Sequence, residues 1–242
     1  MQMISELLNN THPEWHAILN PALAVMDKAY LDVLSTTDDY LPQKTQLFAA
    51  FGRPLSRTDY ILLGESPYPR AASANGHAFW DVAVDSLWSE TGLSKSVNRA
   101  TSLRNLIKML LHARGDLTHD FSQPAIASLD KTNYHQTLDA LFLKLLNQGF
   151  MLLNASLVYQ ENKVAYHARH WAPFMSVILD KLACEKPNIK LILFGKIAEK
   201  IAGYQRFDCV IAEHPYNISF ITNSDVLNFF KPMDLLLNDS KK

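Results

Sequence analysis

The chain has 242 residues, of which 48% are hydrophobic and 19% are charged, so it is long and apolar enough to bury a sizeable core. Its 23 lysines and arginines nearly balance 24 aspartates and glutamates, which excludes a strongly basic protein that coats nucleic acid. Two cysteines are too few for a disulfide framework or an all-cysteine zinc site, and they suit a reducing compartment.

The start of the chain carries no basic segment followed by an apolar run, and so does not resemble a signal peptide. Its apolar stretches fall well short of the ~20 residues needed to span a bilayer. We therefore expect a cytoplasmic protein without a membrane segment. No linker or repeat divides the chain, and we expect a single domain over residues 1–242.

The first third of the chain has a helical pattern. Apolar residues from Trp15 to Val33 recur mostly at intervals of three and four, which is one face of a helix, and predict a helical segment over about residues 1–38. The run 47–51 predicts a second, short helix that Gly52 and Pro54 end.

Four short apolar runs then predict buried strands, and apolar periodicity predicts helices in the gaps. The strands are expected at 60–63, 150–153, 189–194 and 209–212, and the helices at 103–111, 134–146, 173–182 and 197–201. Strands that alternate with helices indicate a parallel sheet covered on both faces. The expected fold class is α/β, a three-layer α/β/α sandwich with a central, mostly parallel four-stranded sheet.

Polar residues follow each predicted strand. They are Glu65 with Ser66, then Asn154, then Lys196 after a glycine, and finally His214. Because ligands bind beyond the carboxyl ends of parallel strands, we expect these clusters to converge on one site.

Several of these segments resemble one family when they are compared motif by motif. Residues 64–69 read G-E-S-P-Y-P and residues 76–79 read G-H-A-F. They resemble the water-activating loop of the family-1 uracil-DNA glycosylases, G-Q-D-P-Y-H followed by G-L-A-F or G-L-C-F. Residues 102–106, 152–155 and 214–219 resemble that family's S-L-x-N-I, L-L-N-[AT] and H-P-S-P-L-S. The resemblance spans roughly residues 40–237.

This resemblance implies a DNA-repair glycosylase that hydrolyses the N-glycosidic bond of uracil, or of a related damaged base, after flipping it out of DNA. Phe79 would stack on the base, and Asn154 would pair with its Watson–Crick edge. Tyr68 would reject the methyl group of thymine, and His214 would donate a hydrogen bond to the departing base. Ile218 would wedge into the vacated stack.

The water-activating loop departs from the family pattern. Ser66 stands where the family has its water-positioning aspartate, and a serine hydroxyl cannot accept a proton at neutral pH. Glu65 stands where family 1 has glutamine, although a thermophile-type branch with G-E-A-P-G has glutamate there. Glu65 could supply the missing carboxylate only if the loop turned differently.

The expected DNA clamp is altered as well. Ser102 ends an Ala-Thr-Ser segment in place of the family's proline-serine loop, and Tyr216 replaces a phosphate-binding serine. Lys196 could contact a phosphate as a point charge. With Ile218, these residues are the expected DNA contacts. The resemblance implies a monomer that acts on DNA without a cofactor, and no histidine spacing indicates a metal.

The substitutions leave three functions open. The first is the repair glycosylase. The second is a catalytically weakened member of the superfamily that binds nucleic acid or a protein partner, which the loss of the aspartate favours. The third is a small-molecule hydrolase on the same fold, which the near-neutral charge and the altered clamp favour.

Overall fold

The computed structural model describes residues 8–238, apart from the side chain of Ala198, and its chain divides into two compact units. The first unit comprises the described parts of Met1–Asp81, Gly149–Leu193 and Ile197–Cys209. The second comprises Val82–Gln148, Phe194–Lys196 and the described part of Val210–Lys242. Two centres of packing therefore form from interleaved stretches of one chain.

A four-stranded sheet is present where the apolar runs predict it. Its strands are β1 (Tyr60–Gly64), β4 (Phe150–Asn154), β5 (Lys190–Phe194) and β6 (Asp208–Ala212), in the order β4-β1-β5-β6. Strand β1 pairs in parallel with both β4 and β5. The predicted α/β class, with a central four-stranded sheet flanked by helices, is confirmed.

The strands are buried on both faces. Ile61, Leu63 and Met151 belong to the core cluster of the first unit, together with apolar side chains of α8 (Val164–Glu185). Leu62 and Leu152, which point to the opposite face, are also buried. A sheet covered on both sides explains why its strands are continuous apolar runs instead of alternating ones.

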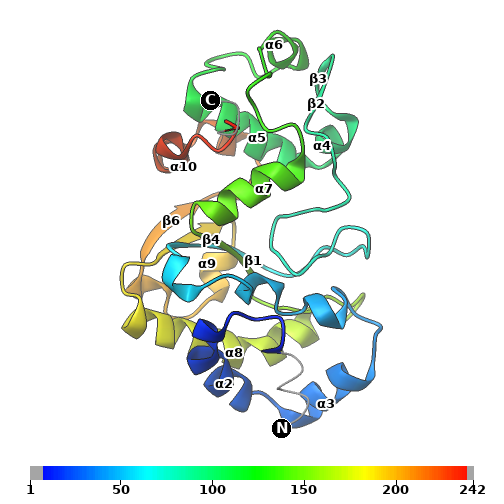
Figure 1. Ribbon diagram of the computed structural model, residues 1–242, viewed down its shortest axis with the longest axis vertical. Helices are drawn as coiled ribbons and strands as arrows, with labels where there is room; N and C mark the ends of the chain where they lie inside the picture. Colours follow the sequence, from blue (N-terminus) through cyan, green and yellow to red (C-terminus); the bar gives the residue numbers. More distant parts are fainter. Residues whose placement is uncertain (1–7, 239–242) are drawn as a thin grey trace. The chain divides into compact units, whose positions relative to one another are not determined.

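The helices of the first unit correct two predictions. The expected N-terminal run is two helices, α2 (His16–Ala24) and α3 (Lys28–Thr36), because the Asp27 carboxylate accepts the Ala29 N–H at 2.8 Å and begins a new helix. Helix α8 starts well before the predicted residue 173 and runs through Pro173, which is exposed. Helices α2 and α8 pack on one another (Figure 1).

The remaining elements of the first unit are short. The predicted helix at 47–51 is a pair of 3-10 turns, since only η2 (Lys44–Gln46) and η3 (Ala49–Phe51) form there. Helix α9 (Ile197–Lys200) confirms the predicted helix at 197–201. The other elements are η1 (Pro13–Trp15), η4 (Leu55–Arg57) and η5 (Tyr204–Arg206).

The second unit is built around one long helix, α5 (Thr101–Arg114), and α7 (Leu138–Asn147), which confirm two predicted helices. The periodicity did not predict the short elements, whose two to seven residues are too few to show it. These are β2 (Trp88–Ser89), β3 (Gly92–Leu93), α4 (Lys95–Arg99), α6 (Gln123–Ala127), η6 (Ile218–Thr222), α10 (Ser224–Phe230) and η7 (Lys231–Met233). Within residues 8–238, no helix is long and apolar enough to cross a membrane.

Candidate active site

Gly64, at the carboxyl end of β1, is the point where two predicted site residues meet. A Cβ atom added there would lie 2.6 Å from Asn154 Oδ1, 2.9 Å from Ala78 Cβ and 3.6 Å from the Phe79 ring. Only glycine leaves room for these neighbours. The structure therefore brings Phe79 and Asn154 together in the first unit, as expected.

Asn154 owes its position to the sheet register. It ends β4 directly opposite Gly64 of β1, and it is buried, with 2% of its surface exposed. A carboxamide carries both a donor and an acceptor on one flat group. Because the amide is buried away from water, a hydrogen bond from a ligand with a complementary edge is stronger there than at the surface.

Phe79 is held in a strained backbone conformation. Its φ angle is 64°, in the left-handed region that non-glycine residues rarely enter, at a cost of about 1–3 kcal/mol. Two hydrogen bonds hold the backbone in this conformation. The Ala78 N–H donates to the Leu152 carbonyl at 3.0 Å. The Tyr68 hydroxyl donates to the carbonyl of Phe79 itself at 3.1 Å. Such strain, held by its surroundings, is typical of a functional position.

The Tyr68 hydroxyl stays protonated because burial raises the pKa of the phenol far above its usual value of 10. It can therefore act as the donor that the bond to Phe79 requires. The loop that carries Tyr68 is thus tied to the loop that carries Phe79. The expected role of Tyr68 in rejecting thymine stays a prediction.

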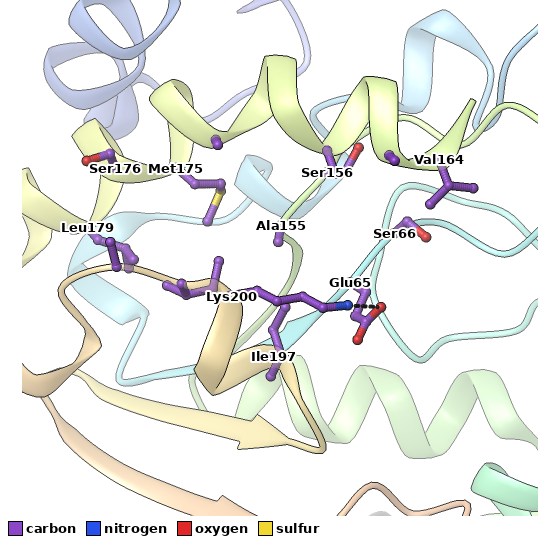
Figure 2. Close-up of a pocket in the computed structure, with 15 residues that line it drawn as sticks. Glu65, Ser66, Ala155, Ser156, Val164, Met175, Ser176, Leu179, Ile197 and Lys200 are labelled. Atoms are coloured by element: carbon purple, nitrogen blue, oxygen red, sulfur yellow. Dashed lines mark ion pairs between the residues drawn. The ribbon is translucent and has the colours of Figure 1, made fainter. Parts of the chain in front are cut away.

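Glu65 and Ser66 follow Gly64 and line a separate cavity of about 540 Å³ (Figure 2). Its walls are small and apolar side chains of α8, and Ile197 and the stem of Lys200 from α9. The Glu65 carboxylate extends to the Lys200 ammonium at 3.0 Å, and both side chains are more than half exposed. Ser66 is half-buried.

Lys200 is a residue that the sequence analysis missed. Nothing in its local sequence marks it, because the ion pair joins the loop after β1 to α9, and these segments are far apart in the chain. The pair gives the loop carboxylate a cationic partner within the first unit. Among the described residues, no cluster of histidines, cysteines and carboxylates fits a metal ion.

His214 lies in the second unit, beside the end of β5. A Cβ atom on Gly195 would lie 2.9 Å from His214 Cβ, and the φ angle of Gly195 is +76°, so glycine is needed there. The Tyr216 N–H donates to His214 Nδ1 at 3.1 Å. Because Nδ1 accepts this bond, the neutral ring carries its proton on Nε2, which is the atom that can donate.

The expected DNA contacts are also in the second unit. Tyr216 and Ile218 are 69% and 81% exposed, which is unusual for side chains of their size. The Asn105 amide of α5 donates to the Pro215 carbonyl at 2.7 Å and fixes the segment that carries them. Ser102 is half-buried in the first turn of α5, and Lys196 is exposed.

The fold and these side chains together define a class of protein. A parallel α/β sheet that presents a buried carboxamide and an aromatic ring at its strand ends is suited to a flat ring with hydrogen-bonding edges, such as a nucleobase.

Comparison with known proteins identifies the class more closely. The crystal structure of wild-type UNG from Nitratifractor salsuginis matches with a TM-score of 0.92 and 40% sequence identity, covering 98% of both chains. The uracil-DNA glycosylase of Campylobacter lari is 25% identical over 228 residues, which are 92% of this chain and 86% of that one. The Helicobacter pylori enzyme of the same name is 28% identical over 208 residues, which are 82% of this chain and 78% of that one.

A more distant structure shares the fold alone. Mimivirus uracil-DNA glycosylase has a TM-score of 0.59 and 16% identity over 88% of this chain and 72% of that one. No family model matches the sequence. On the full-length similarity at 40% identity, the chain belongs to the uracil-DNA glycosylase family.

Proposed function

We propose that this chain removes uracil from DNA by hydrolysing its N-glycosidic bond, with Phe79 and Asn154 holding the extruded base and His214 stabilising it as it leaves. The observation that carries the proposal is the meeting of the Asn154 amide and the Phe79 ring over Gly64. Family membership places the chain among the DNA-repair glycosylases, which are hydrolases.

Base reading follows from the chemistry of these side chains. The Asn154 amide offers a donor and an acceptor that match the Watson–Crick edge of uracil, and the Phe79 ring offers a stacking face. As the bond from C1′ to the base breaks, its electron pair passes to the uracil ring. The proton on His214 Nε2 then meets developing negative charge, an effect worth about 10²–10³-fold in rate.

The water step involves the two altered residues of the loop. A water oxygen forms the new bond to C1′ and gives up its proton. We assign the proton to the Glu65 carboxylate, which has to turn from its cavity toward the base, and the positioning of the water to the Ser66 hydroxyl, since serine cannot serve as the base at neutral pH. The ion pair to Lys200 is exposed and contributes at most about 1 kcal/mol, so Glu65 can leave it at small cost.

The remaining elements of the proposal concern the partner and the setting. DNA is the partner, contacted by Ser102, Lys196, Tyr216 and Ile218, and the chain acts as a monomer in the cytoplasm. The exposure of Tyr216 and Ile218 supports this assignment. No cofactor enters the mechanism.

Excision from single-stranded DNA with one uracil tests the proposal, with alkaline cleavage as the readout. We expect Asn154→Ala and His214→Ala to lose at least about 100-fold each. Matched controls, Asn20→Ala and His119→Ala at exposed positions, should keep wild-type rates. Equal rates in the site variants and their controls would overturn the base-reading assignment.

Two further variants test the water step in the same assay. Glu65→Gln should reduce excision about 10–100-fold. The control Glu199→Gln makes the same change at an exposed carboxylate on α9 and should leave the rate unchanged. Ser66→Asp restores the family's carboxylate and should raise the rate. If Glu65→Gln has no effect, Glu65 has no part in the mechanism.

A second candidate function is supported by one specific observation. Ser66 cannot accept a proton, and the neighbouring carboxylate is engaged by Lys200, which is the arrangement expected of a binding protein with slow chemistry. That reading predicts salt-sensitive binding of uracil-containing DNA without measurable excision.

A further inference from the structure

We infer that a hollow in the second unit, between α5 and η6, is a binding site for a backbone phosphate of DNA, with Lys108 and Arg104 as its cationic ligands. The inference rests on the proposed function and adds to it a contact that neither the sequence motifs nor the family resemblance assigns.

The hollow has a volume of about 630 Å³. Arg104 and Lys108 enter it from the same face of α5, because residues four apart on a helix lie one above the other. Ile218 and Thr222 of η6 line the opposite side. Two cations therefore share one partly enclosed space.

The two cations have no ion-pair partner in the part of the chain that the structure describes. Among residues 8–238, no carboxylate forms an ion pair with Lys108 or Arg104. Burial lowers the pKa of Lys108, the positive charge of Arg104 lowers it further, and the charge of Asp120 acts in the opposite direction. The Asp120 carboxylate accepts the Ser122 N–H at 2.8 Å, so it already has a partner on its own loop.

Several hydrogen-bonding groups that line the hollow already have partners. The Arg104 guanidinium donates to the Asn98 carbonyl at 3.0 Å, which fixes its orientation. The Gln123 amide donates to Asn98 Oδ1 at 2.7 Å, and Gln123 Oε1 accepts the Leu93 N–H at 2.7 Å. These bonds do not neutralise the positive charges of Arg104 and Lys108. An anion with several acceptor oxygens would relieve the repulsion between the two cations.

The position of the hollow shows which anion it suits. Ile218 lines it and is 81% exposed, and the segment before Ile218 is bonded to Asn105 of α5. If Ile218 enters the base stack, the phosphate next to that step lies at the hollow. This contact would replace the clamp serine, whose place is taken by Tyr216.

The experiment measures binding to duplex DNA that carries an uncleavable abasic-site analogue, so that no excision is needed. Lys108→Gln should lower the slope of log affinity against log salt by about 0.9, the value for one phosphate contact, while Lys108→Arg should keep it. The control Lys181→Gln removes the same charge from an exposed position on α8 and should leave the slope unchanged.

Replacing single phosphates of the duplex with neutral methylphosphonates identifies the contact. One position flanking the lesion should weaken wild-type binding about tenfold and should not weaken Lys108→Gln further. Inorganic phosphate that competes equally well with wild type and Lys108→Gln, or equal slopes for Lys108→Gln and Lys181→Gln, would overturn the inference. If the wild type excises no uracil but its salt slope still differs from that of Lys108→Gln, the proposed function is overturned and the phosphate site is not.

Discussion

The residues proposed to read the base and those proposed to hold the DNA differ in how the protein supports them. Asn154 is buried at a strand end, and Phe79 is held in a strained conformation by hydrogen bonds. Tyr216 and Ile218, by contrast, are exposed on a segment that Asn105 anchors. Recognition of a base edge requires groups that are fixed and shielded from water. Contact with the DNA backbone requires only exposed side chains and positive charge, which several positions on the surface can supply.

This difference bears on which changes each region can tolerate. A base-reading amide has to stay where the strand register of β4 holds it. A backbone phosphate can be contacted from more than one surface, and the contact proposed for Lys108 in the hollow beside η6 is one example.

The largest effect is expected from Gly64→Ala. Its new methyl group would meet Asn154 Oδ1 at 2.6 Å and Ala78 Cβ at 2.9 Å, so the amide or the loop must move. We expect kcat/KM for uracil excision to fall about 100-fold or more, because sub-ångström misplacement is costly at such sites. Gly115→Ala, where a methyl group meets nothing within 4 Å, should lose only about 1 kcal/mol of stability from its positive φ angle. Excision within fivefold of wild type in Gly64→Ala would contradict this account.

A smaller and more selective effect is expected from Ile218→Ala. An apolar wedge helps only where bases are stacked, so excision from duplex DNA should fall about tenfold while excision from single strands changes less than twofold. The ratio of the two rates is the measurement. An equal loss on both substrates would remove Ile218 from the wedge role.

The smallest effect is expected on stability at low pH, through His77. Burial and the Arg53 charge lower the pKa of His77 to about 4, and its buried Nδ1 meets no hydrogen-bond partner within residues 8–238. The unfolded chain, with an ordinary histidine pKa, binds the proton first as pH falls, so the folded state loses stability below about pH 6.5. Between pH 7 and pH 5 the loss from this residue is about 2 kcal/mol.

The variant His77→Leu tests that assignment. It removes the titrating ring and should flatten the dependence of unfolding free energy on pH across this range, as measured by urea denaturation. His119→Leu, at an exposed position, serves as the control and should keep the wild-type slope. Identical slopes in His77→Leu and wild type would show that His77 is protonated without penalty.

The sequence predicted the four strands of the sheet well, because local signals define them. Each strand is a continuous apolar run, and Asn154 and Gly64 follow from the ends of two such runs. The division at Asp27 was missed because the apolar spacing continues across the break. The start of α8 was missed because Pro173 is tolerated on an exposed turn of a long helix.

The parts that sequence could not predict depend on residues far apart in the chain. The pairing of Glu65 with Lys200 joins the loop after β1 to α9, and η6 forms one side of the hollow at Lys108. The two-residue strands β2 and β3 carry no periodicity at all. Such features arise from packing alone.

The central claim is that Phe79 and Asn154 hold the same base, and a titration of isotope-labelled protein with free uracil tests it most directly. We predict that the ring signals of Phe79 and the side-chain amide signals of Asn154 both shift, with one shared dissociation constant, and that thymine shifts neither. A response from only one of the two side chains, or two unrelated dissociation constants, would contradict the claim.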